Sequence, residues 1–315
     1  MGSTIQILLA TYNGAAHLDA FFDSIEKQQF QDWSMLVRDD CSSDATREVL
    51  AQWRDRLGDR LQFLPDSGAC NLGVVRSFSR LLNASTAPYV MFADQDDVWY
   101  PDKIAVSLAT MQQRESLTSP SSPILVHTDL ALMDQDLQPI APSYWKYQGI
   151  VPENGHALNS MMVENIAAGC TCIFNRPLIE LVGEIPAGAR YHDWWVSLVA
   201  AAFGHIVSLP IQTLAWRRHS SNSSDIISLS QAVWRALTRT PEAARTLSSL
   251  LAENRPQVQL FLERYHHRLT PSQVADVRAF LDLPTHGFLK RRISVLQHRL
   301  FFTSWQRTAG MLVLV

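Results

Sequence analysis

Three short apolar runs alternate with helical patterns in the first hundred residues, and each run ends in a polar cluster. The runs are "IQILLA" at 5–10, "SMLVRDD" at 34–40 and "YVMFA" at 89–93. Between the first two, apolar residues recur at helical spacing over 17–28. Strands that alternate with helices form a mostly parallel sheet with helices on both faces. We therefore expect an α/β fold that binds its ligands beyond the carboxyl ends of the strands.

Residues 1–227 are expected to form the α/β part of the chain, and residues 228–315 a helical appendage. The boundary lies where strand patterns stop and helical spacing, interrupted by prolines, takes over. Further strands are expected at 61–64, 124–134, 167–176, 206–210 and 212–219. Further helices are expected at 44–57 (capped by Ser43 or Asp44), at 74–83, after Pro101, and at 193–203 (capped by Asp193). Interruptions of the appendage are expected at Pro241, Pro256, Pro271 and Pro284.

Composition excludes some classes of protein. The chain has 315 residues, of which 47% are hydrophobic, and a formal net charge of −3. This length allows a large core, and this charge gives no support for a protein that coats nucleic acid, so no nucleic-acid partner is expected. No basic leader precedes an apolar stretch at the N-terminus, and no segment reaches the roughly 18 apolar residues of a membrane helix. We expect a cytoplasmic protein.

The spacing of the cysteines does not indicate a metal site or a set of disulfides. The four cysteines are Cys41, Cys70, Cys170 and Cys172, and no CxxC pair occurs among them. Neither a structural zinc site nor a disulfide framework is indicated for a chain of this size. We expect buried, reduced cysteines.

The last part of the chain has a distinct charge pattern. Asp282 is the final acidic residue, and the basic residues after it are interleaved with aromatic and aliphatic ones, ending in "GMLVLV". Such a pattern suits contact with a membrane surface through residues 286–315. A helix docked on the α/β part, or a contact in a homodimer, explains the pattern equally well.

Three aspartates within four positions follow the run at 89–93. Asp94, Asp96 and Asp97 lie in a loop after a strand, so at least one of them can point into the expected binding crevice. Two carboxylates at Asp-x-Asp spacing suit Mg²⁺ or Mn²⁺, which complete their coordination with phosphate and water. A turn that caps the next helix is the alternative, and it accounts for Asp97 or Asp102 but hardly for the whole cluster.

Four motifs together resemble the nucleotide-sugar-binding half of family-2 inverting glycosyltransferases of the GT-A (Rossmann-like) fold. The motifs are "LLATYNG", "LVRDDCSSD", "CNLGVVRSF" and "FADQDDVWYPDK", and the form "ADQDDVW" is most similar to rhamnosyltransferase-type members. The resemblance covers about residues 4–225. It implies that 1–115 bind the nucleotide sugar and that 116–227 hold the acceptor and the catalytic base.

The resemblance implies a donor site at the first four motifs. Thr11, Tyr12 and Asn13 would lie under the base and ribose, and Asp40 would accept the N3–H of uracil or thymine. Arg76 would lie near the base and phosphates. Asp94 would contact ribose or metal-bound water, next to Gln95. Asp96 would ligate the metal, which stabilises the leaving diphosphate as a Lewis acid.

Two later motifs imply the catalytic residues. In "RYHDWW", Asp193 would be the base that deprotonates the acceptor hydroxyl, while His192 replaces the glutamate usual in the family. Trp194 and Trp195 would supply one ring that stacks on the acceptor and one core ring. Gly169 would allow close approach of the donor sugar. In "WRRHSSN", Arg217 and Arg218 would neutralise the phosphates, and His219 would complete the metal shell.

The resulting hypothesis is a metal-dependent inverting glycosyltransferase, with dTDP-rhamnose as the best donor and a UDP-hexose as the alternative. The acceptor would be a growing, possibly lipid-linked, surface glycan. A nucleotidyltransferase would be expected to carry a Gly- and Arg-rich phosphate loop where "TYNGAAH" stands, and no GxxxxGK or GxGxxG motif is present. A catalytically silent nucleotide-sugar-binding protein remains the third possibility.

Overall fold

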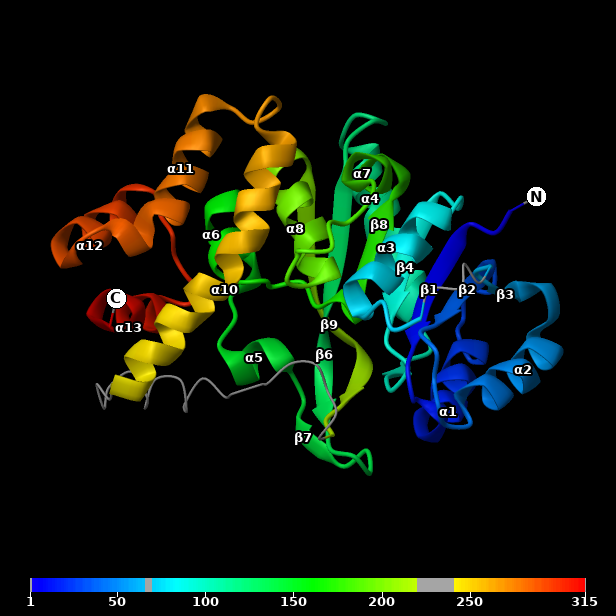
Figure 1. Cartoon of the computed structure of the whole chain (residues 1–315). Coiled ribbons are helices and arrows are strands. Elements are labelled where there is room, and N and C mark those ends of the chain that lie inside the picture. The colour runs from blue at the N-terminus through cyan, green and yellow to red at the C-terminus, as the bar shows by residue number, and fades with distance from the viewer. Residues whose placement is uncertain (1, 66–69, 220–240, 315) are drawn as a thin grey trace.

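A single curved sheet forms the centre of the molecule in the computed structural model, which describes residues 2–65, 70–219 and 241–314. Within these residues the strand order is β3-β2-β1-β4-β8-β6-β9-β5, and β7 pairs with the far end of β6. Helices lie on both sides of the sheet, and α10 to α13 form a separate group at the end of the molecule opposite β3 (Figure 1). The expected α/β architecture with a helical appendage is confirmed.

The N-terminal half of the sheet is parallel. It consists of β1 (Ile5–Thr11), β2 (Trp33–Asp39), β3 (Leu61–Phe63) and β4 (Tyr89–Ala93), with β1 between β2 and β4. Parallel strands all end at the same edge, so the segments that follow β1, β2 and β4 meet there.

The second half of the sheet is mixed. β8 (Cys172–Asn175) is antiparallel to both β4 and β6 (Ile124–Met133), while β9 (His205–Arg217) runs parallel to β6. The short strands are β5 (Val98–Trp99), paired with β9, and β7 (Pro139–Ala141), paired with β6. The sequence analysis expects two strands at 206–210 and 212–219. One long strand with register shifts against β6 forms instead, because Pro210 needs no ladder partner at such an irregularity.

The helices cover the sheet in chain order. Those of the α/β part are α1 (Ala15–Glu26), α2 (Thr46–Leu57), α3 (Val74–Ala84), α4 (Lys103–Ser116), α5 (Tyr144–Gln148), α6 (Leu158–Val163), α7 (Arg176–Val182) and α8 (His192–Phe203). Short 3-10 turns occupy Gly58–Arg60, Pro152–Gly155, Gly169–Thr171 and Leu283–Thr285. The expected strand at 167–176 is therefore shorter, and a tight turn at Gly169 precedes it.

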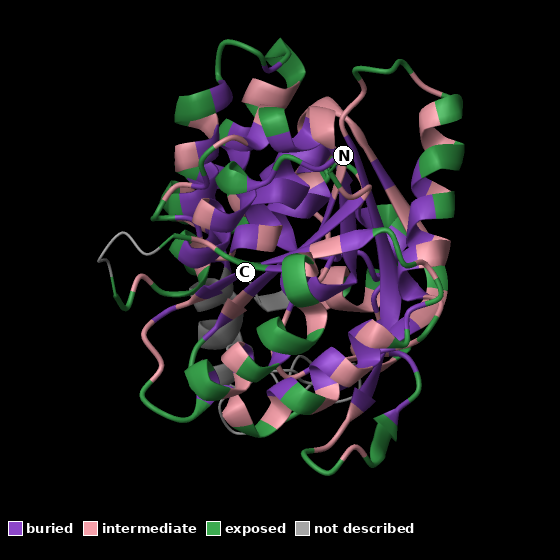
Figure 2. Ribbon diagram, turned by 90° about the vertical axis from the view of Figure 1, so that its right-hand side faces the viewer, coloured by how far each residue is buried: buried purple, intermediate pink, exposed green. Residues whose placement is uncertain are grey.

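Burial on both faces explains why the strands read as continuous apolar runs. In β1, Ile7 and Leu9 belong to one core cluster with Phe21 of α1, whereas Leu8 belongs to a second cluster with Phe78 of α3. Successive residues of a strand point to opposite faces, so β1 contributes side chains to both core clusters. In Figure 2 the central strands are mostly buried, while the outer helices alternate buried and exposed turns.

The appendage consists of α10 (Pro241–Tyr265), α11 (Pro271–Asp282), α12 (Phe288–Gln297) and α13 (Trp305–Leu314). Prolines begin α10 and α11 as expected, but Pro256 lies inside α10, so the expected interruption there is wrong. Phe261 and Tyr265 of α10 pack against Trp195 of α8. The proposed boundary between 227 and 228 lies outside the described residues.

Two cysteine pairs behave differently. Cys170 and Cys172 are buried and reduced, as expected. Cys41 and Cys70 form a disulfide, which corrects the expectation that all four are reduced. The two cysteines are 29 residues apart along the chain. They are close in space because the segment after β2 meets the segment before α3. The disulfide joins these two segments at the edge where the strands end.

Candidate active site

Polar side chains from three loops interlock where β1, β2 and β4 end. The Thr11 hydroxyl donates to Asp39 (3.0 Å), and the Asp40 amide donates to the Thr11 carbonyl (2.8 Å). The Gln95 side chain accepts from the Tyr12 amide (2.9 Å) and donates to the Tyr12 carbonyl (3.0 Å). A Cβ at Gly14 would lie 2.2 Å from Gln95 Oε1, so this contact requires glycine there. The three loops therefore hold one another in place.

Asn13 fixes the turn after β1. It adopts a left-handed conformation with φ of 48°, its amide donates to Ser42, and its side-chain oxygen accepts from the Ser43 amide (2.8 Å). Tyr12, next to it, is 53% exposed and presents its ring to solvent. Of the three residues assigned to the base and ribose, Tyr12 is thus the one with an open ring face, while Thr11 is buried.

Asp40 is buried and already well hydrogen-bonded. One of its oxygens accepts from Arg38 Nη1 and from the Leu72 amide, both at 2.8 Å, and the other accepts from the Gly73 amide at 2.7 Å. Burial by itself raises the pKa of Asp40, but these hydrogen bonds outweigh it and hold the pKa below its ordinary value. A carboxylate oxygen accepts two hydrogen bonds, so Oδ2 keeps one position for a further donor such as a base N–H.

The arginines assigned to the phosphates lie in different settings. Arg217 is buried at the end of β9 and donates to the carbonyls of Asp96 (3.3 Å) and Gln135 (2.8 Å). Its neighbour Arg218 is exposed. Arg76 is exposed in the first turn of α3. Arg217 therefore anchors the aspartate loop through its backbone, while Arg76 and Arg218 present their side chains to solvent.

The two residues assigned to the metal lie together. His219 Nε2 is 2.6 Å from Asp96 Oδ2, and both side chains keep a small exposed fraction of 15% and 13%. His17 of α1 stacks on the His219 ring at 5.2 Å. Burial, Arg217 and His219 lower the pKa of His17, so this ring is neutral near pH 7. One carboxylate oxygen and one imidazole nitrogen fit the donor set of Mn²⁺ or Mg²⁺ completed by phosphate oxygens.

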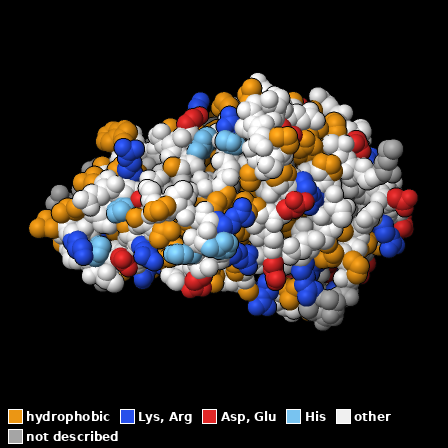
Figure 3. Space-filling model, turned by 90° about the horizontal axis from the view of Figure 1, so that it is seen from above, with side chains coloured by type: hydrophobic (Ala, Val, Ile, Leu, Met, Phe, Trp, Pro, Cys, Tyr) orange, Lys and Arg blue, Asp and Glu red, His pale blue; other side chains and the backbone are white. Residues whose placement is uncertain are grey.

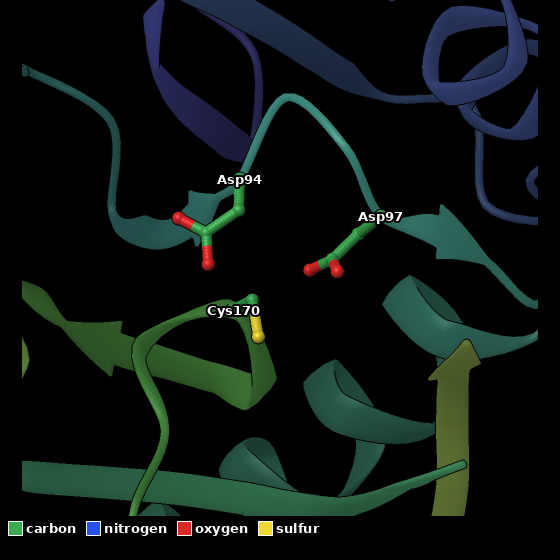
Figure 4. A group of neighbouring side chains, drawn as sticks. All are labelled: Asp94, Asp97 and Cys170. Carbon is green, nitrogen blue, oxygen red and sulfur yellow. The ribbon is translucent and has the colours of Figure 1, made fainter. Parts of the chain in front are cut away.

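Behind this pair, Asp94, Asp97 and Cys170 converge, with one possible ligand atom of each within 4.8 Å of the others. Figure 4 shows the two carboxylates on the same side of their loop, with Cys170 beside them. Burial raises the pKa of the Cys170 thiol, so it stays protonated near neutral pH. Both carboxylate oxygens of Asp97 are buried without a hydrogen-bond partner among the described residues. The expected alternative, that Asp97 caps the next helix, is therefore not observed.

The electrostatics of this cluster favour protonated carboxyls. Burial, together with Asp96 and Asp193, raises the pKa of Asp94 to about 7. Burial and the Asp94 charge raise the pKa of Asp97 well above its usual range. The nearby Lys103 is fully buried over the Trp99 ring at 4.7 Å, and burial lowers its pKa to about 8. A divalent cation at Asp96 would offset the repulsion within this group.

Asp193 lies in the first turn of α8, facing the aspartate loop. Its Oδ2 accepts from the Gly169 amide at 2.8 Å, and its Oδ1 accepts from the Trp194 amide at 2.6 Å. Burial raises its pKa to about 6, although these bonds and one from Asn165 oppose the rise. A Cβ at Gly169 would lie 3.0 Å from the Asp193 Cβ. Asp193 is therefore an oriented carboxylate with a pKa suited to proton transfer near neutrality.

Several expectations around Asp193 need correction. Tyr191, not Asp193, is the N-cap of α8. Trp194 and Trp195 are both buried, at 5% and 0% exposed, so Trp195 is the expected core ring but Trp194 offers no stacking surface to an acceptor. The Trp194 indole N–H donates to the Met161 carbonyl, which holds the ring in the core. His192 stacks on Phe78 at 3.9 Å, and burial lowers its pKa to about 3, so it packs as a neutral ring.

The residues that sequence reasoning misses are His17, Lys103, Asn165 and Cys170. His17 and Lys103 lie on helices where their spacing matches ordinary surface positions. Asn165 and Cys170 flank Gly169, which alone was assigned a role there. No local pattern reveals His17, Asn165 or Cys170, because each lies next to a residue more than twenty positions away.

Comparison with known proteins agrees with this geometry. Residues 6–141 match the family described as Glycosyl transferase family 2. This part of the chain is therefore similar to family-2 glycosyltransferases.

Curated relatives match part of the chain. The putative teichuronic acid biosynthesis glycosyltransferase TuaG of Bacillus subtilis is 28% identical over 138 residues, which is 43% of this chain and 50% of that protein. The dTDP-rhamnosyl transferase RfbG of Shigella flexneri is 32% identical over 99 residues, which is 30% of this chain and 34% of that protein. The chain thus spans about half, or less, of the length of these relatives.

A solved structure matches nearly the whole chain. The S. aureus TarS 1–349 structure in complex with UDP-GlcNAc superposes with a TM-score of 0.56 at 13% identity, covering 98% of this chain and 89% of that one. At this identity the likeness establishes the GT-A fold, including the region beyond residue 141. Among the described residues, no helix is both long enough and apolar enough to cross a membrane.

Proposed function

We propose that this protein is a metal-dependent, inverting glycosyltransferase that moves a sugar from a nucleoside diphosphate to a glycan hydroxyl. One observation carries the proposal: Asp193, with a pKa of about 6, faces the loop on which Asp96 meets His219. A proton acceptor and a possible site for a diphosphate-bound metal therefore both lie near Asp94, whose pKa Asp96 and Asp193 raise. That is the arrangement that a single displacement needs.

The donor that fits best is a pyrimidine nucleotide sugar. The free position on Asp40 Oδ2 suits the N3–H of uracil or thymine, and the exposed Tyr12 ring suits a base. Arg76 and Arg218 would meet the phosphates as charged donors. The "ADQDDVW" motif and the likeness to a dTDP-rhamnosyl transferase favour dTDP-rhamnose, while the likeness to a UDP-GlcNAc complex keeps a UDP-hexose as the alternative.

A divalent ion, Mg²⁺ or Mn²⁺, would be held by Asp96 and His219 and would stabilise charge on the leaving diphosphate. The protein's own residues do the rest. Arg217 holds the Asp96 backbone, and the Gly169 amide aims the Asp193 carboxylate. Asp94, whose pKa is about 7, lies between the two groups and can hydrogen-bond a sugar or ribose hydroxyl in either protonation state.

The reaction would proceed in one step. The acceptor hydroxyl attacks the anomeric carbon while its proton passes to Asp193, and the bond from that carbon to the diphosphate oxygen breaks. A new glycosidic bond forms and the nucleoside diphosphate leaves. In this scheme the acceptor oxygen is the only nucleophile, and it attacks from the side opposite the leaving diphosphate. The configuration of the anomeric carbon therefore inverts.

The acceptor would be a growing surface polysaccharide. The likeness to a teichuronic acid glycosyltransferase supports this assignment. We assign the reaction to the cytoplasm. A lipid-linked acceptor would bring the enzyme to the inner face of the membrane.

A melting-temperature panel tests the donor site. The purified protein is heated with dTDP-rhamnose, other dTDP- and UDP-sugars and GDP-mannose, each with and without Mn²⁺ or Mg²⁺. Because a ligand that binds only the native state raises the melting temperature, one pyrimidine sugar should give a metal-dependent rise. Asp96→Ala should lose the rise, and Asp55→Ala, on the exposed surface of α2, should keep it. A folded wild-type protein that responds to no pyrimidine nucleotide would contradict the proposal.

A further inference from the structure

The helix α12 exposes an apolar stripe to solvent. Leu289, Ile293 and Leu296, spaced by four and three residues, are 72%, 52% and 54% exposed, and Phe288 is 65% exposed. Residues three and four apart share one helix face. The opposite face is packed, since Val295 is buried in the core of the appendage. The first three side chains form one row, and Phe288 lies beside its start. Monomeric proteins rarely leave such an apolar patch uncovered.

Cations surround the stripe. Lys290 and Arg299 are exposed, and Arg292 lies over the Phe288 ring at 3.4 Å. Arg291 is half-buried beside them. No aspartate or glutamate follows Asp282 in the sequence, so no acidic residue of this segment balances them. Figure 3 shows hydrophobic and basic side chains side by side at the end of the molecule where α12 lies.

Trp305 extends the same character into the next helix. It begins α13 and is 75% exposed, although the three residues before it are buried. Tryptophan combines a large apolar surface with a polar N–H and is favoured at membrane–water interfaces. We define the exposed surface of residues 288, 289, 293 and 296, with the basic residues 290, 292 and 299 and with Trp305, as the α12 surface.

We propose that the α12 surface binds the headgroup region of a bilayer that contains anionic lipids. The apolar side chains would enter the boundary between headgroups and acyl chains, and the cations would meet lipid phosphates. A second copy of the chain is a poorer occupant. A two-fold interface would place this surface against itself, so its cations would face like charges.

The surface is tied to the acceptor side of the site by a short path. The segment between α12 and α13 donates from the Thr303 amide (3.1 Å) and hydroxyl (2.9 Å) to Glu164. The next residue along the chain, Asn165, lies close enough to Asp193 for its side chain to lower the pKa of that carboxyl. Arg307 of α13 also pairs with Glu164. A protein docked through α12 would therefore hold its acceptor side near the lipid surface.

Vesicle co-sedimentation tests the inference. The full chain is mixed with vesicles of phosphatidylcholine alone or with about one-third phosphatidylglycerol. We expect binding to the anionic vesicles that falls as salt is raised. Leu289→Glu with Ile293→Glu should weaken it at least about tenfold. Lys290→Gln with Arg299→Gln should weaken it about fivefold for each charge removed.

Leu117→Glu is the matched control, because Leu117 is 71% exposed at the end of α4 and far along the chain from this surface. It should bind vesicles as the wild type does. Equal vesicle binding by Leu117→Glu and the α12 variants, or no binding by the wild type, would overturn the proposal. So would light scattering that shows a dimer broken by Leu289→Glu with Ile293→Glu.

The donor-induced rise in melting temperature is measured on every variant. It reports the nucleotide site and the fold without reference to lipid. Loss of vesicle binding with this rise intact therefore concerns the α12 surface alone. Failure of the transferase proposal would instead leave vesicle binding unchanged.

Discussion

The aspartates at the end of β2 and those around Asp193 differ in what surrounds their carboxylates. Asp39 and Asp40 accept several hydrogen bonds, which outweigh burial and hold their pKa values below the ordinary range. Asp94 and Asp97 have few such bonds, and Asp193 accepts them but has no cationic partner among the described residues. Burial therefore raises the pKa values of all three, to about 7 for Asp94 and about 6 for Asp193. The first group keeps its charge at any physiological pH, whereas the second exchanges protons there.

This difference separates two tasks within one crevice. A base-recognition site needs an acceptor held in a fixed position. The Asp40 carboxylate is such an acceptor, because the backbone amides at 72 and 73 and the Arg38 guanidinium donate to it. A catalytic base must instead gain and lose a proton during turnover, so its charged form cannot be strongly stabilised. Hydrogen bonding keeps the carboxylate of the proposed base-recognition site charged, whereas exclusion of water raises the pKa of the proposed catalytic base.

The largest effect is expected for the variant Asp193→Asn, which tests whether this carboxylate exchanges a proton during turnover. The amide cannot take the acceptor proton, so we expect kcat to fall by about 10²- to 10⁴-fold. Donor binding, followed as the rise in melting temperature, should be unchanged. A variant with near wild-type turnover would remove Asp193 from the mechanism, and a wild type that binds donor but never turns over would favour the silent binding protein.

Asp40→Ala tests the structural side of the comparison. It leaves the Arg38 guanidinium buried without its carboxylate, and such a loss costs about 3 kcal/mol of unfolding free energy. Urea unfolding measures it. Asp55→Ala is the control, because the Arg54–Asp55 pair is exposed and spans 3.6 Å, so its removal should cost less than about 0.5 kcal/mol. Equal costs would mean that the buried pair contributes no more than a surface pair.

The pH dependence of kcat/KM should have an acid limb near pH 6, because only the ionised form of Asp193 accepts a proton. Asn165 hydrogen-bonds the carboxylate and lowers its pKa. Asn165→Ala should therefore raise the pKa of Asp193 and move the limb to higher pH. A limb that stays in place would assign it to another group, such as Asp94.

The smallest effect is expected for Gln95→Ala. Its amide makes two hydrogen bonds to the Tyr12 backbone, and their loss costs about 1 kcal/mol of preorganisation. The KM for the donor should rise about fivefold with kcat nearly unchanged. Gln62→Ala, at an exposed position on β3, is the control and should leave the KM for the donor as it is.

Much of the fold was predictable because local patterns decide it. The strands at 5–11, 33–39 and 89–93 and the helices between them follow from apolar periodicity that the observed burial reproduces. The motif residues Asp96 and His219, 123 positions apart, were assigned to one metal by resemblance, and they lie in contact. Their role as ligands stays a prediction.

What was missed depends on contacts between distant segments. The disulfide from Cys41 to Cys70 and the approach of Cys170 to Asp97 arise only when separate loops meet. The same holds for Trp194, which reads as a surface ring until the Met161 carbonyl and the core around it are in place. Spacing along the sequence gives no signal for such contacts.

The continuity of the core across the appendage has a consequence for how this protein can change. Trp195 and the proposed base Asp193 share the helix α8, and α10 covers Trp195 with Phe261 and Tyr265. The catalytic half and the appendage should therefore melt together in one cooperative transition. If relatives exchanged the appendage as an independent module, the apolar side chains of α8, the helix that carries the proposed base Asp193, would be exposed to solvent. New acceptor specificities are then expected to arise by substitution within the shared core rather than by recombination at its edge.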